Sequence, residues 1–558
     1  MESRFHSVKL LEDKCKGCTN CIKRCPTEAI RVREGKAVIN AARCIDCGEC
    51  VRTCDNHAKA IIANSLEDLQ GFDYNIALPA PALYSQIGRA SGPDEVVWAL
   101  EQMGFDAVCD VSFGADIVTE CTRRYIKANT LPKPLISSAC PAVVRLVQVR
   151  FPGLIPHLAK MESPMYAAAR VARARVGAQL RIPDERIGVF FISPCAAKVT
   201  AIISPLGSQE SYVNGALSIG DIYGRLIANL GRGGSSRPLY RGSGLGFGWA
   251  MDGGELRALG DMKALAVDGI HNVIGVLEEA DSGRLKRVDY IEALACQAGC
   301  VGGPATVENP FVARVRMRDV SAGIDARSMA ESLQLAWDCI DEFGDDFFHM
   351  HEPIHPLAGM ELAESLESAI ARMGELERIV RELPGLDCGA CGSPTCRTHA
   401  EDVVCGRAIE TDCVFKLRER MQEMAEDLLR LARTDLPSME EGRRLTVQDI
   451  ADAIGMTCVA GSSGMDREVT SGYASDLLSD AMGHAQDGAI WVTSQVHQNV
   501  VAVALLLNLS AVVIAGGLSL MEDATAKADA RSMAMLSTDL PTFEVVGRLY
   551  ELGVRGKA

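Results

Sequence analysis

Apolar residues along the chain follow two spacings, one typical of amphipathic helices and one typical of buried strands. Segments 360–382 and 414–433 carry apolar residues three and four positions apart, which predicts helices with one apolar side. The runs 187–192 (IGVFFI) and 511–517 (AVVIAGG) are short and rich in β-branched or aromatic residues, which predicts buried strands. The chain is therefore predicted to be a multidomain protein of mixed α/β and α+β architecture.

The stretch from Val500 to Ala515 is almost wholly apolar. It has only 16 residues and is interrupted by Asn508 and Ser510, whereas a membrane-spanning helix needs about 20 apolar residues. A buried helix followed by a buried strand fits it better. No charged-then-apolar signal segment opens the chain, so we expect a cytoplasmic protein without a membrane segment.

Composition and charge narrow the class of protein. The 558 residues predict three or four domains. The formal charge of −16 argues against a nucleic-acid-binding protein, and the 48% hydrophobic content excludes a disordered chain. Cysteine is the outlier, with 21 residues that fall in groups. Grouped cysteines in a large chain of cytosolic type indicate metal ligands and not disulfides.

Eight of these cysteines form a doubled motif near the start of the chain. Residues 15–26 (CKGCTNCIKRCP) and 44–54 (CIDCGECVRTC) share the spacing C-x2-C-x2-C-x3-C. In such runs the fourth cysteine ligates the other cluster. Zinc is the alternative, which the doubled order disfavours. We therefore assign one 4Fe–4S cluster to Cys15, Cys18, Cys21 and Cys54, and a second to Cys44, Cys47, Cys50 and Cys25.

This segment resembles a bacterial two-cluster ferredoxin over residues 8–62. Residues 1–62 carry 12 Lys/Arg and 8 Asp/Glu, a net charge of +4 in an otherwise acidic protein. A basic face of this kind could steer an acidic redox partner. A solvated surface without a partner is the alternative.

Four isolated cysteines lie in the long central stretch, and we call them the cysteine quartet: Cys140, Cys195, Cys296 and Cys300. Each has Gly, Pro or small neighbours, which let a bulky inorganic group approach the backbone. Four thiolates from three separate loops could hold a further 4Fe–4S cluster. Buried, inert cysteines are the alternative.

The sequence around the quartet resembles the catalytic domain of FeFe-hydrogenases over roughly residues 72–355. Three family motifs occur in order, as Ser138-Ala139-Cys140-Pro141, then Pro194-Cys195-Ala196-Ala197-Lys198, then Cys296 to Cys300 followed by Gly302-Gly303. The stretch LPAPALYSQIG also resembles the opening strand of the family.

This resemblance implies an H-cluster. The quartet would hold a 4Fe–4S cube, Cys300 would also bridge to a two-iron unit carrying CO and cyanide, and Lys198 would hydrogen-bond one cyanide. Pro194, Ala80 and Pro81 would line the pocket. The implied reaction is the reversible cleavage of H2 to protons and electrons. The implied partners are a redox protein such as ferredoxin and the hydrogenase maturation proteins.

The proton-carrying residues depart from the family pattern. Ala139 replaces the cysteine that carries the last proton, and alanine cannot do so. Thr122 and Tyr125 occupy the places of the relay glutamates, with Glu120 and Cys121 just before them. This pattern resembles the sensory and putatively sensory branches of the family. It predicts slow turnover, with a substitute proton route through Glu120 or Cys121.

A rival interpretation comes from the same superfamily, which includes cytosolic Fe–S assembly proteins that keep the four cysteines without a two-iron unit. Lys198 and the intact third motif favour a true H-cluster. Two functional hypotheses therefore stay open, an enzyme with modest H2 chemistry and a sensor of H2 or redox state.

A last cysteine group precedes the tail of the chain. Cys388, Cys391, Cys396 and Cys413 have the spacing C-x2-C-x4-C-x16-C, which resembles the small 4Fe–4S domain of corrinoid iron–sulfur proteins, with zinc as the alternative. The tail alternates helix-like and strand-like runs and resembles a regulatory DRTGG domain.

The predicted domains follow from these motifs. The two amphipathic helices serve as linkers and could also form the seam of a homodimer. The boundaries are 1–65 for the two-cluster domain, 70–357 for the H-cluster domain, 358–383 for a helical linker, 384–415 for the third 4Fe–4S domain, 416–438 for a second helical linker, and 440–558 for the DRTGG-like domain.

Overall fold

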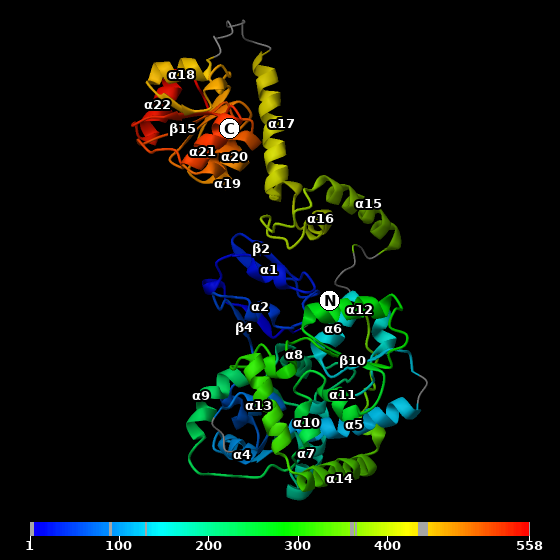
Figure 1. Ribbon diagram of the computed structural model, residues 1–558. Coiled ribbons are helices and arrows are strands. Elements are labelled where there is room, and N and C mark those ends of the chain that lie inside the picture. Colours follow the sequence, from blue (N-terminus) through cyan, green and yellow to red (C-terminus); the bar gives the residue numbers. More distant parts are fainter. Residues whose placement is uncertain are drawn as a thin grey trace. The chain divides into compact units, whose positions relative to one another are not determined.

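The computed structural model describes residues 5–88, 92–128, 131–357, 362, 365–433 and 445–556. The chain divides into two compact units, Met1–Asp427 and Leu428–Ala558 (Figure 1). Among the helices of these described ranges, none is long and apolar enough to cross a membrane. The mixed α/β architecture that the sequence predicts is confirmed.

Residues 5–62, here called the N-terminal module, consist of two short antiparallel strand pairs and two short helices. Strands β1 (Val8–Leu10) and β4 (Lys59–Ile61) pair, as do β2 (Ile30–Arg33) and β3 (Lys36–Ile39). Helices α1 (Asn20–Arg24) and α2 (Glu49–Arg52) each contain the third cysteine of one motif. The β2–β3 turn has positive φ at both Glu34 and Gly35, the geometry of a type I′ hairpin.

The central part, residues 72–357, contains two parallel sheets. The first has the strand order β6-β5-β8-β9, from β5 (Tyr74–Pro79), β6 (Ala107–Val108), β8 (Ile187–Ser193) and β9 (Gly215–Ser218). The second has the order β10-β11-β7, from β7 (Leu135–Ile136), β10 (Ala264–Asp268) and β11 (Tyr290–Leu294). Strand β8 is the predicted IGVFFI strand and is buried along its whole length, as expected for a central parallel strand.

Helices cover both sheets and bury separate apolar cores. The helices are α3 (Pro81–Ser85), α4 (Pro93–Glu101), α5 (Val111–Ala128), α6 (Pro141–Arg150), α7 (Pro164–Leu180), α8 (Ala196–Ile203), α9 (Ile219–Asn229), α10 (Gly244–Gly248), α11 (Gly254–Leu259), α12 (Ile270–Asp281), α13 (Pro310–Gly323) and α14 (Ala326–Phe343). On the first sheet, Ala77 and Phe190 face one core while Ile76 and Val189 face another, because successive strand residues alternate sides.

Residues 384–415, here called the third-cluster module, follow helix α15 (Leu366–Glu382) and contain α16 (Cys396–Val404). The apolar side of α15 packs on α16 through Leu376 and Ile379, as the helical pattern predicts. Helix α17 (Val414–Arg433) follows, and its apolar residues Leu417 and Met421 are exposed. Residues 358–361, 363–364 and 434–438 of the predicted linkers lie outside the described residues.

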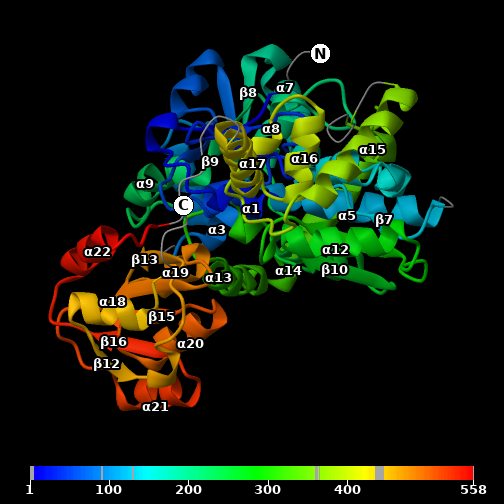
Figure 2. The ribbon, with the colours of Figure 1, turned by 90° about the horizontal axis from the view of Figure 1, so that it is seen from above.

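The second unit contains a five-stranded sheet of order β12-β16-β15-β14-β13 (Figure 2). Strands β13 (Ser471–Ala474), β14 (Ala489–Thr493), β15 (Ala511–Ile514) and β16 (Ala534–Ser537) are parallel, and β12 (Thr457–Ala460) is antiparallel. Helices α19 (Leu478–His484), α20 (Gln498–Leu506) and α21 (Glu522–Ala530) cover one face, and α18 (Val447–Ile454) and α22 (Thr542–Glu551) cover the other. The stretch from Val500 to Ala515 forms part of α20 and strand β15, as predicted.

Candidate functional site

The cysteine quartet lies where strands of the two central sheets end. Cys140 is the N-cap of α6 and follows β7, and Cys195 is the N-cap of α8 directly after β8. Cys296 lies two residues beyond β11, and Cys300 lies in the short helical turn Gly299–Gly302. Ligand sites of open parallel sheets form at the carboxyl ends of strands, because the loops there converge. The two sheets thus deliver all four thiols to one region.

Lys198 lies close to the quartet. Its Nζ lies 3.9 Å from the Sγ of Cys300. Burial lowers the pKa of Lys198, but the neighbouring thiols of the quartet, with Cys300 first, raise the pKa well above its usual value. All four thiols thus lie within electrostatic range of one ammonium group. The site therefore combines four thiols with one half-buried cation.

The protein environment controls the charge of these thiols. Burial raises the pKa of Cys195, and it raises that of Cys296 to about 12. Lys198 opposes this effect, since it lowers the pKa of Cys195 and Cys300, and Cys195 also lies at the N-terminus of α8, which favours an anion there. The thiols must lose protons to bind metal. Lys198 compensates part of the negative charge that results.

The glycines of the third motif are required by close packing. A Cβ atom on Gly303 would lie 2.1 Å from the carbonyl oxygen of Pro194, so only glycine lets these two loops touch. Gly299 has φ of +82° and a Cβ there would lie 2.7 Å from the Ala250 oxygen. The pocket-lining residues Ala80 and Pro81 follow β5, which pairs in parallel with β8 and so brings them beside Pro194.

The residues predicted to carry protons have other neighbours. Both Glu120 carboxylate oxygens pair with arginines of α5, 3.3 Å from Arg123 and 3.2 Å from Arg124. Cys121 is fully buried in an apolar core, and burial raises its pKa to about 12. Ala139 is half-buried at the edge of that core, with its backbone N–H 3.3 Å from the Ser137 hydroxyl.

The structure instead brings two buried carboxyl groups together in the central part, which sequence reasoning missed. Glu255 of α11 accepts hydrogen bonds from the hydroxyls of Tyr290 at 2.6 Å and Ser137 at 2.7 Å. Glu292 of β11 accepts one from the Leu256 N–H at 3.0 Å, while its Oε1 atom is buried without a partner. Burial raises the pKa of Cys300, and the Glu292 carboxyl adds to this shift, so Glu292 lies near the quartet.

Burial raises the pKa of both carboxyl groups, and the charge of Glu255 raises that of Glu292 further. Burial and the neighbouring charge thus both favour the protonated form of Glu292. One signal in the sequence could have found them. Glu292 interrupts an otherwise apolar strand four residues before Cys296, and an acidic residue in a fully buried strand is rare unless it has a function.

The other predicted cysteine ligands also come together. Each predicted group of four cysteines lines one small hollow. In the N-terminal module, the fourth cysteine of each motif lines the hollow formed by the first three cysteines of the other motif, as predicted. The groups are Cys15, Cys18, Cys21 and Cys54; Cys25, Cys44, Cys47 and Cys50; and Cys388, Cys391, Cys396 and Cys413. All-thiol donor sets of four fit 4Fe–4S clusters.

The basic residues of the N-terminal module serve a contact within the chain. Asp402 of the third-cluster module pairs with Arg31 and, at 3.2 Å, with Arg33. Glu401 pairs with Arg43 at 2.9 Å, and the Val32 N–H donates to the Gly392 oxygen at 2.7 Å. At Arg31, Arg33 and Arg43, the acidic groups that face these cations therefore belong to the third-cluster module of the same chain.

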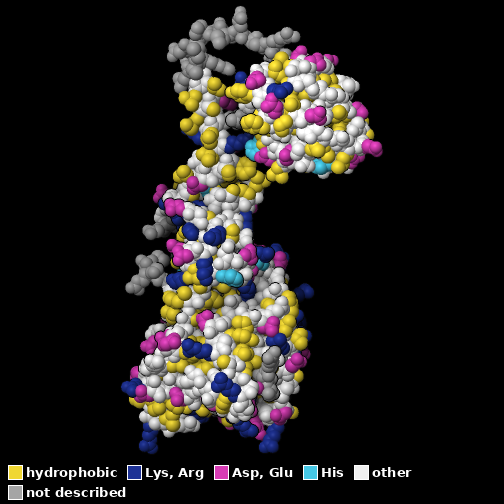
Figure 3. Space-filling model, turned by 90° about the vertical axis from the view of Figure 1, so that its left-hand side faces the viewer, with side chains coloured by type: hydrophobic (Ala, Val, Ile, Leu, Met, Phe, Trp, Pro, Cys, Tyr) yellow, Lys and Arg dark blue, Asp and Glu magenta, His cyan; other side chains and the backbone are white. Residues whose placement is uncertain are grey.

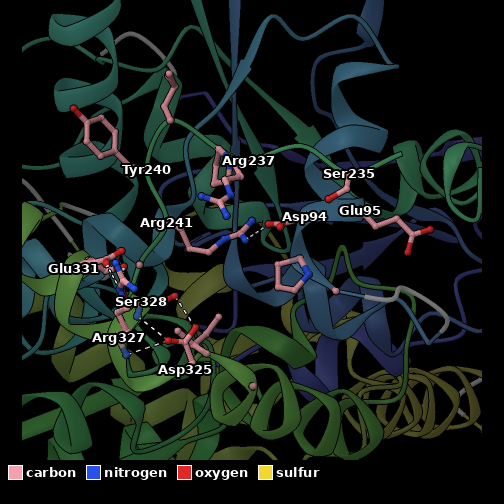
Figure 4. A pocket seen from close by; sticks show the side chains of 18 of the residues that line it. Asp94, Glu95, Ser235, Arg237, Tyr240, Arg241, Asp325, Arg327, Ser328 and Glu331 are labelled. Atoms are coloured by element: carbon pink, nitrogen blue, oxygen red, sulfur yellow. Dashed lines mark hydrogen bonds and ion pairs between the residues drawn. The ribbon is translucent and has the colours of Figure 1, made fainter. Parts of the chain in front are cut away.

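A larger groove of about 1180 Å³ lies elsewhere in the central part (Figure 4). The loop 231–242 and helices α4 and α14 line it, and no cysteine does. Arg241 points across it to Asp94 and also pairs with the buried Asp110 at 2.9 Å. The charge of Arg241 is thus compensated by two carboxylates.

Comparisons with known families agree with the motifs. Residues 73–224 and 252–304 match the family model "Iron only hydrogenase large subunit, C-terminal domain". Residues 7–55 match a 4Fe–4S dicluster domain, and residues 383–415 match a putative Fe–S cluster domain.

Curated relatives include the periplasmic iron hydrogenase large subunit of Nitratidesulfovibrio vulgaris, 28% identical over 216 residues that cover 35% of this chain and 51% of that protein. A cytosolic Fe–S cluster assembly factor of Aspergillus terreus is 34% identical over 85 residues, which cover 15% of this chain and 14% of that protein. The matches thus span about half of the first relative and much less of the second. A solved FeFe-hydrogenase of Chlamydomonas reinhardtii aligns with a TM-score of 0.40 and 18% identity, over 53% of this chain and 98% of that one.

Proposed function

Since the central part of this chain belongs to the iron-only hydrogenase family, we propose that the protein carries an H-cluster and interconverts H2 with protons and electrons at low turnover. The convergence of the quartet around Lys198 carries this proposal. Cys140, Cys195, Cys296 and Cys300 would hold the 4Fe–4S cube, and Cys300 would also hold the two-iron unit. When bound, that unit supplies the iron at which H2 is cleaved or formed.

Lys198 provides a fixed positive charge beside Cys300. Its Nζ donates toward the Cys300 Sγ at 3.9 Å. This half-buried ammonium could also hydrogen-bond an anionic ligand such as cyanide on the two-iron unit. Pro194, Ala80 and Pro81 are buried and would form an apolar wall on this side of the site.

We assign proton transfer to Glu292 and Glu255, in place of Glu120 and Cys121. Glu292 has one buried carboxylate oxygen without a partner, and it lies near Cys300. Glu255 accepts hydrogen bonds from the hydroxyls of Ser137 and Tyr290, and these hydroxyls can pass a proton on. A carboxyl pair that shares one proton near neutral pH is suited to hold and release it. Ala139 leaves the shorter route without a carrier, which accounts for the low expected turnover.

The packing of the modules suggests one order for electron transfer. The third-cluster module contacts Val32, which also lines the hollow of Cys15, Cys18, Cys21 and Cys54. Cys47, from the other hollow, packs against the apolar core that contains Cys140 and Cys195. Electrons would therefore pass between a redox partner such as ferredoxin and the quartet by way of the third, first and second clusters in turn.

The tail domain supports a sensory role for this slow chemistry, since it adds a separate α/β unit that resembles a regulatory domain. The alternative function is that of an Fe–S electron-transfer or assembly protein without the two-iron unit. The short stretch of identity to an assembly factor favours that alternative.

Maturation of the full chain under anaerobic conditions tests the proposal. Infrared bands of iron-bound CO and cyanide, together with slow H2 evolution, are expected in the wild type and absent in Cys300→Ala. If iron for the 4Fe–4S clusters is incorporated but no such bands appear after treatment with the maturation proteins, the alternative function holds.

A further inference from the structure

The two halves of the N-terminal module share a feature that the cluster ligands do not explain. In each half, the residue two positions after the third cysteine is a cation, Lys23 after Cys21 and Arg52 after Cys50. Both lie near the end of the short helix of their half, α1 or α2. Because the two halves repeat one motif, Lys23 and Arg52 occupy equivalent positions, and each extends from the module toward a different neighbouring part of the chain.

Arg52 reaches the third motif of the quartet site. Its Nη2 donates a hydrogen bond to the Gly302 oxygen at 2.6 Å, and its Nη1 pairs with Glu49 at 3.2 Å. Burial lowers the pKa of Arg52, but Cys296, Glu49 and Cys47 together raise it above its usual value. The guanidinium therefore lies between a ligand of the second cluster and a ligand of the quartet.

The contact around Arg52 is tight. A Cβ atom on Gly48, just before α2, would lie 2.4 Å from the Pro304 ring. The N-terminal strand adds to the same junction, because the Ser7 hydroxyl donates to the Ala196 oxygen at 2.8 Å. The junction beside Arg52 is thus closely packed.

Lys23 reaches the third-cluster module in the same manner. Its Nζ donates to the carbonyl oxygens of Asp387 and, at 2.8 Å, of Pro394. Asp387 directly precedes Cys388, and Pro394 lies two residues before Cys396. Gly389, next to Cys388, is in contact with Lys23, since a Cβ there would lie 3.1 Å from the Lys23 Cε.

We propose that Lys23 and Arg52 are paired positioning residues at the two ends of the N-terminal module, and that each sets the reduction potential of the cluster across its junction. Arg52 acts on the cube of the quartet, and Lys23 acts on the cluster of the third-cluster module. The inference rests on the proposed function, because it requires those clusters.

The physical reason is electrostatic. Reduction adds one negative charge to a cluster, and a nearby fixed cation stabilises that charge, so the cation raises the reduction potential. Arg31, Arg33 and Arg43 act less strongly, because their charges are compensated by the buried Asp402 and Glu401. Arg52 is paired with Glu49 through one nitrogen only, and its other terminal nitrogen faces the neutral Gly302 carbonyl. Lys23 donates to two neutral carbonyls, so its charge remains uncompensated by them.

The test uses the full, anaerobically reconstituted chain with two variants, Arg52→Gln and Lys23→Gln, each the control for the other. Redox titrations followed by EPR measure each cluster's potential. The signal lost in Cys388→Ala identifies the third cluster, and the signal lost in Cys296→Ala identifies the cube of the quartet. Iron content shows whether each variant still assembles its clusters.

Arg52→Gln is expected to make reduction of the quartet cube about tenfold less favourable, a shift of about 59 mV to more negative potential. It should leave the third cluster unchanged, and Lys23→Gln should give the reverse pattern. The conservative variants Arg52→Lys and Lys23→Arg, which keep the charge, should restore most of each shift.

Two results would overturn the inference alone. One is normal iron content with both potentials unchanged, and the other is the same shift of both clusters in both variants, which would indicate a general loss of positive charge. If the wild type assembles no cluster at the quartet or in the third-cluster module, the proposed function fails as well, so the two failures are distinguishable.

Discussion

The N-terminal module and the quartet site build iron–sulfur ligand sets in opposite ways. In the N-terminal module, eight cysteines between Cys15 and Cys54 come from two copies of one local spacing. In the quartet site, four cysteines between Cys140 and Cys300 come from the ends of strands in two sheets. The first site is encoded locally, whereas the second exists only once the central sheets have formed.

The cores of the two regions differ accordingly. The apolar cluster of the N-terminal module includes Cys15, Cys21 and Cys50, with only a few aliphatic side chains such as Val8, Ile22 and Ile30. The central part has four separate cores rich in Val, Leu, Ile and Phe. A small domain with so little apolar surface depends on its metal for stability. The central sheets, with their larger cores, are expected to fold without the quartet's cluster. On the face drawn in Figure 3, acidic and basic side chains are intermixed.

Removal of iron is expected to have the largest effect and to separate the two regions. Anaerobic chelation should abolish protection from hydrogen exchange over residues 8–62, because the thiols there lose the bonds that hold the module together. Strands β5, β8 and β11 should keep their protection. Hydrogen exchange with mass spectrometry measures both regions in one sample.

The control for chelation is readdition of iron and sulfide, which should restore protection over residues 8–62. The comparison breaks down if the N-terminal module stays protected without iron, or if β8 loses protection together with it.

Substitution of the buried carboxyl groups is expected to affect turnover without affecting assembly. Glu292→Gln keeps the shape of the side chain but cannot carry a proton, so H2 evolution by the matured chain should fall about 100-fold. Infrared bands of the two-iron unit should remain. Gas chromatography of H2 and infrared spectra of the same preparation measure both quantities.

Glu120→Gln is the matched control for this variant, because Glu120 is already held by Arg123 and Arg124. Its turnover should stay within a few-fold of the wild type. A greater loss of turnover in Glu120→Gln than in Glu292→Gln would show that protons pass through Glu120 on α5 and not through Glu292.

The two regions also differ in how far the sequence predicts them. The pairing of Cys25 with the second motif and of Cys54 with the first follows from spacing alone, because the ligands lie on one short segment. The strand nature of IGVFFI and AVVIAGG follows from their apolar runs. The proximity of Glu255 and Glu292 does not follow, because these residues lie on α11 and β11 and meet only through the tertiary fold.

The contact between the N-terminal module and the third-cluster module could not be predicted from the sequence pattern either. The excess of positive charge over residues 1–62 predicts an acidic partner, but charge alone does not say that Asp402, more than 350 residues away, is one such partner. Long-range pairing of charges depends on the folded surfaces and leaves no periodic signal. The regulatory interpretation of the tail and its ligand remain predictions.

Loss of the Asp402 charge is expected to weaken this junction. Asp402 has a side chain only 4% exposed and contacts both Arg31 and Arg33. Asp402→Asn leaves the two guanidinium groups without their common anion, which should destabilise the docked module by about 2 kcal/mol. The measurement is hydrogen exchange over residues 386–413.

Glu382→Gln is the matched control, because Glu382 pairs with Arg378 on an exposed surface, where an ion pair contributes little. Equal exchange in both variants would show that the buried ion pairs do not hold the module in place.

The last expected effect is a pH dependence of stability around Glu255 in the central part. Burial raises the pKa of Glu255 to about 7. Between the unfolded value of about 4.3 and this raised value, the folded state holds a proton that the unfolded state has lost, so the free energy of unfolding falls as pH rises, by up to about 1.4 kcal/mol per pH unit.

Glu255→Gln removes this dependence, and its stability advantage over the wild type should grow from pH 5 to 7 and then level off. Hydrogen exchange of the β11 amides, compared between variant and wild type at each pH, measures this advantage. Glu279→Gln, an exposed variant, should show no such growth. A difference between Glu255→Gln and the wild type that is constant across this range would mean that Glu255 is ionised in the folded protein, and the proton-sharing pair would have to be abandoned.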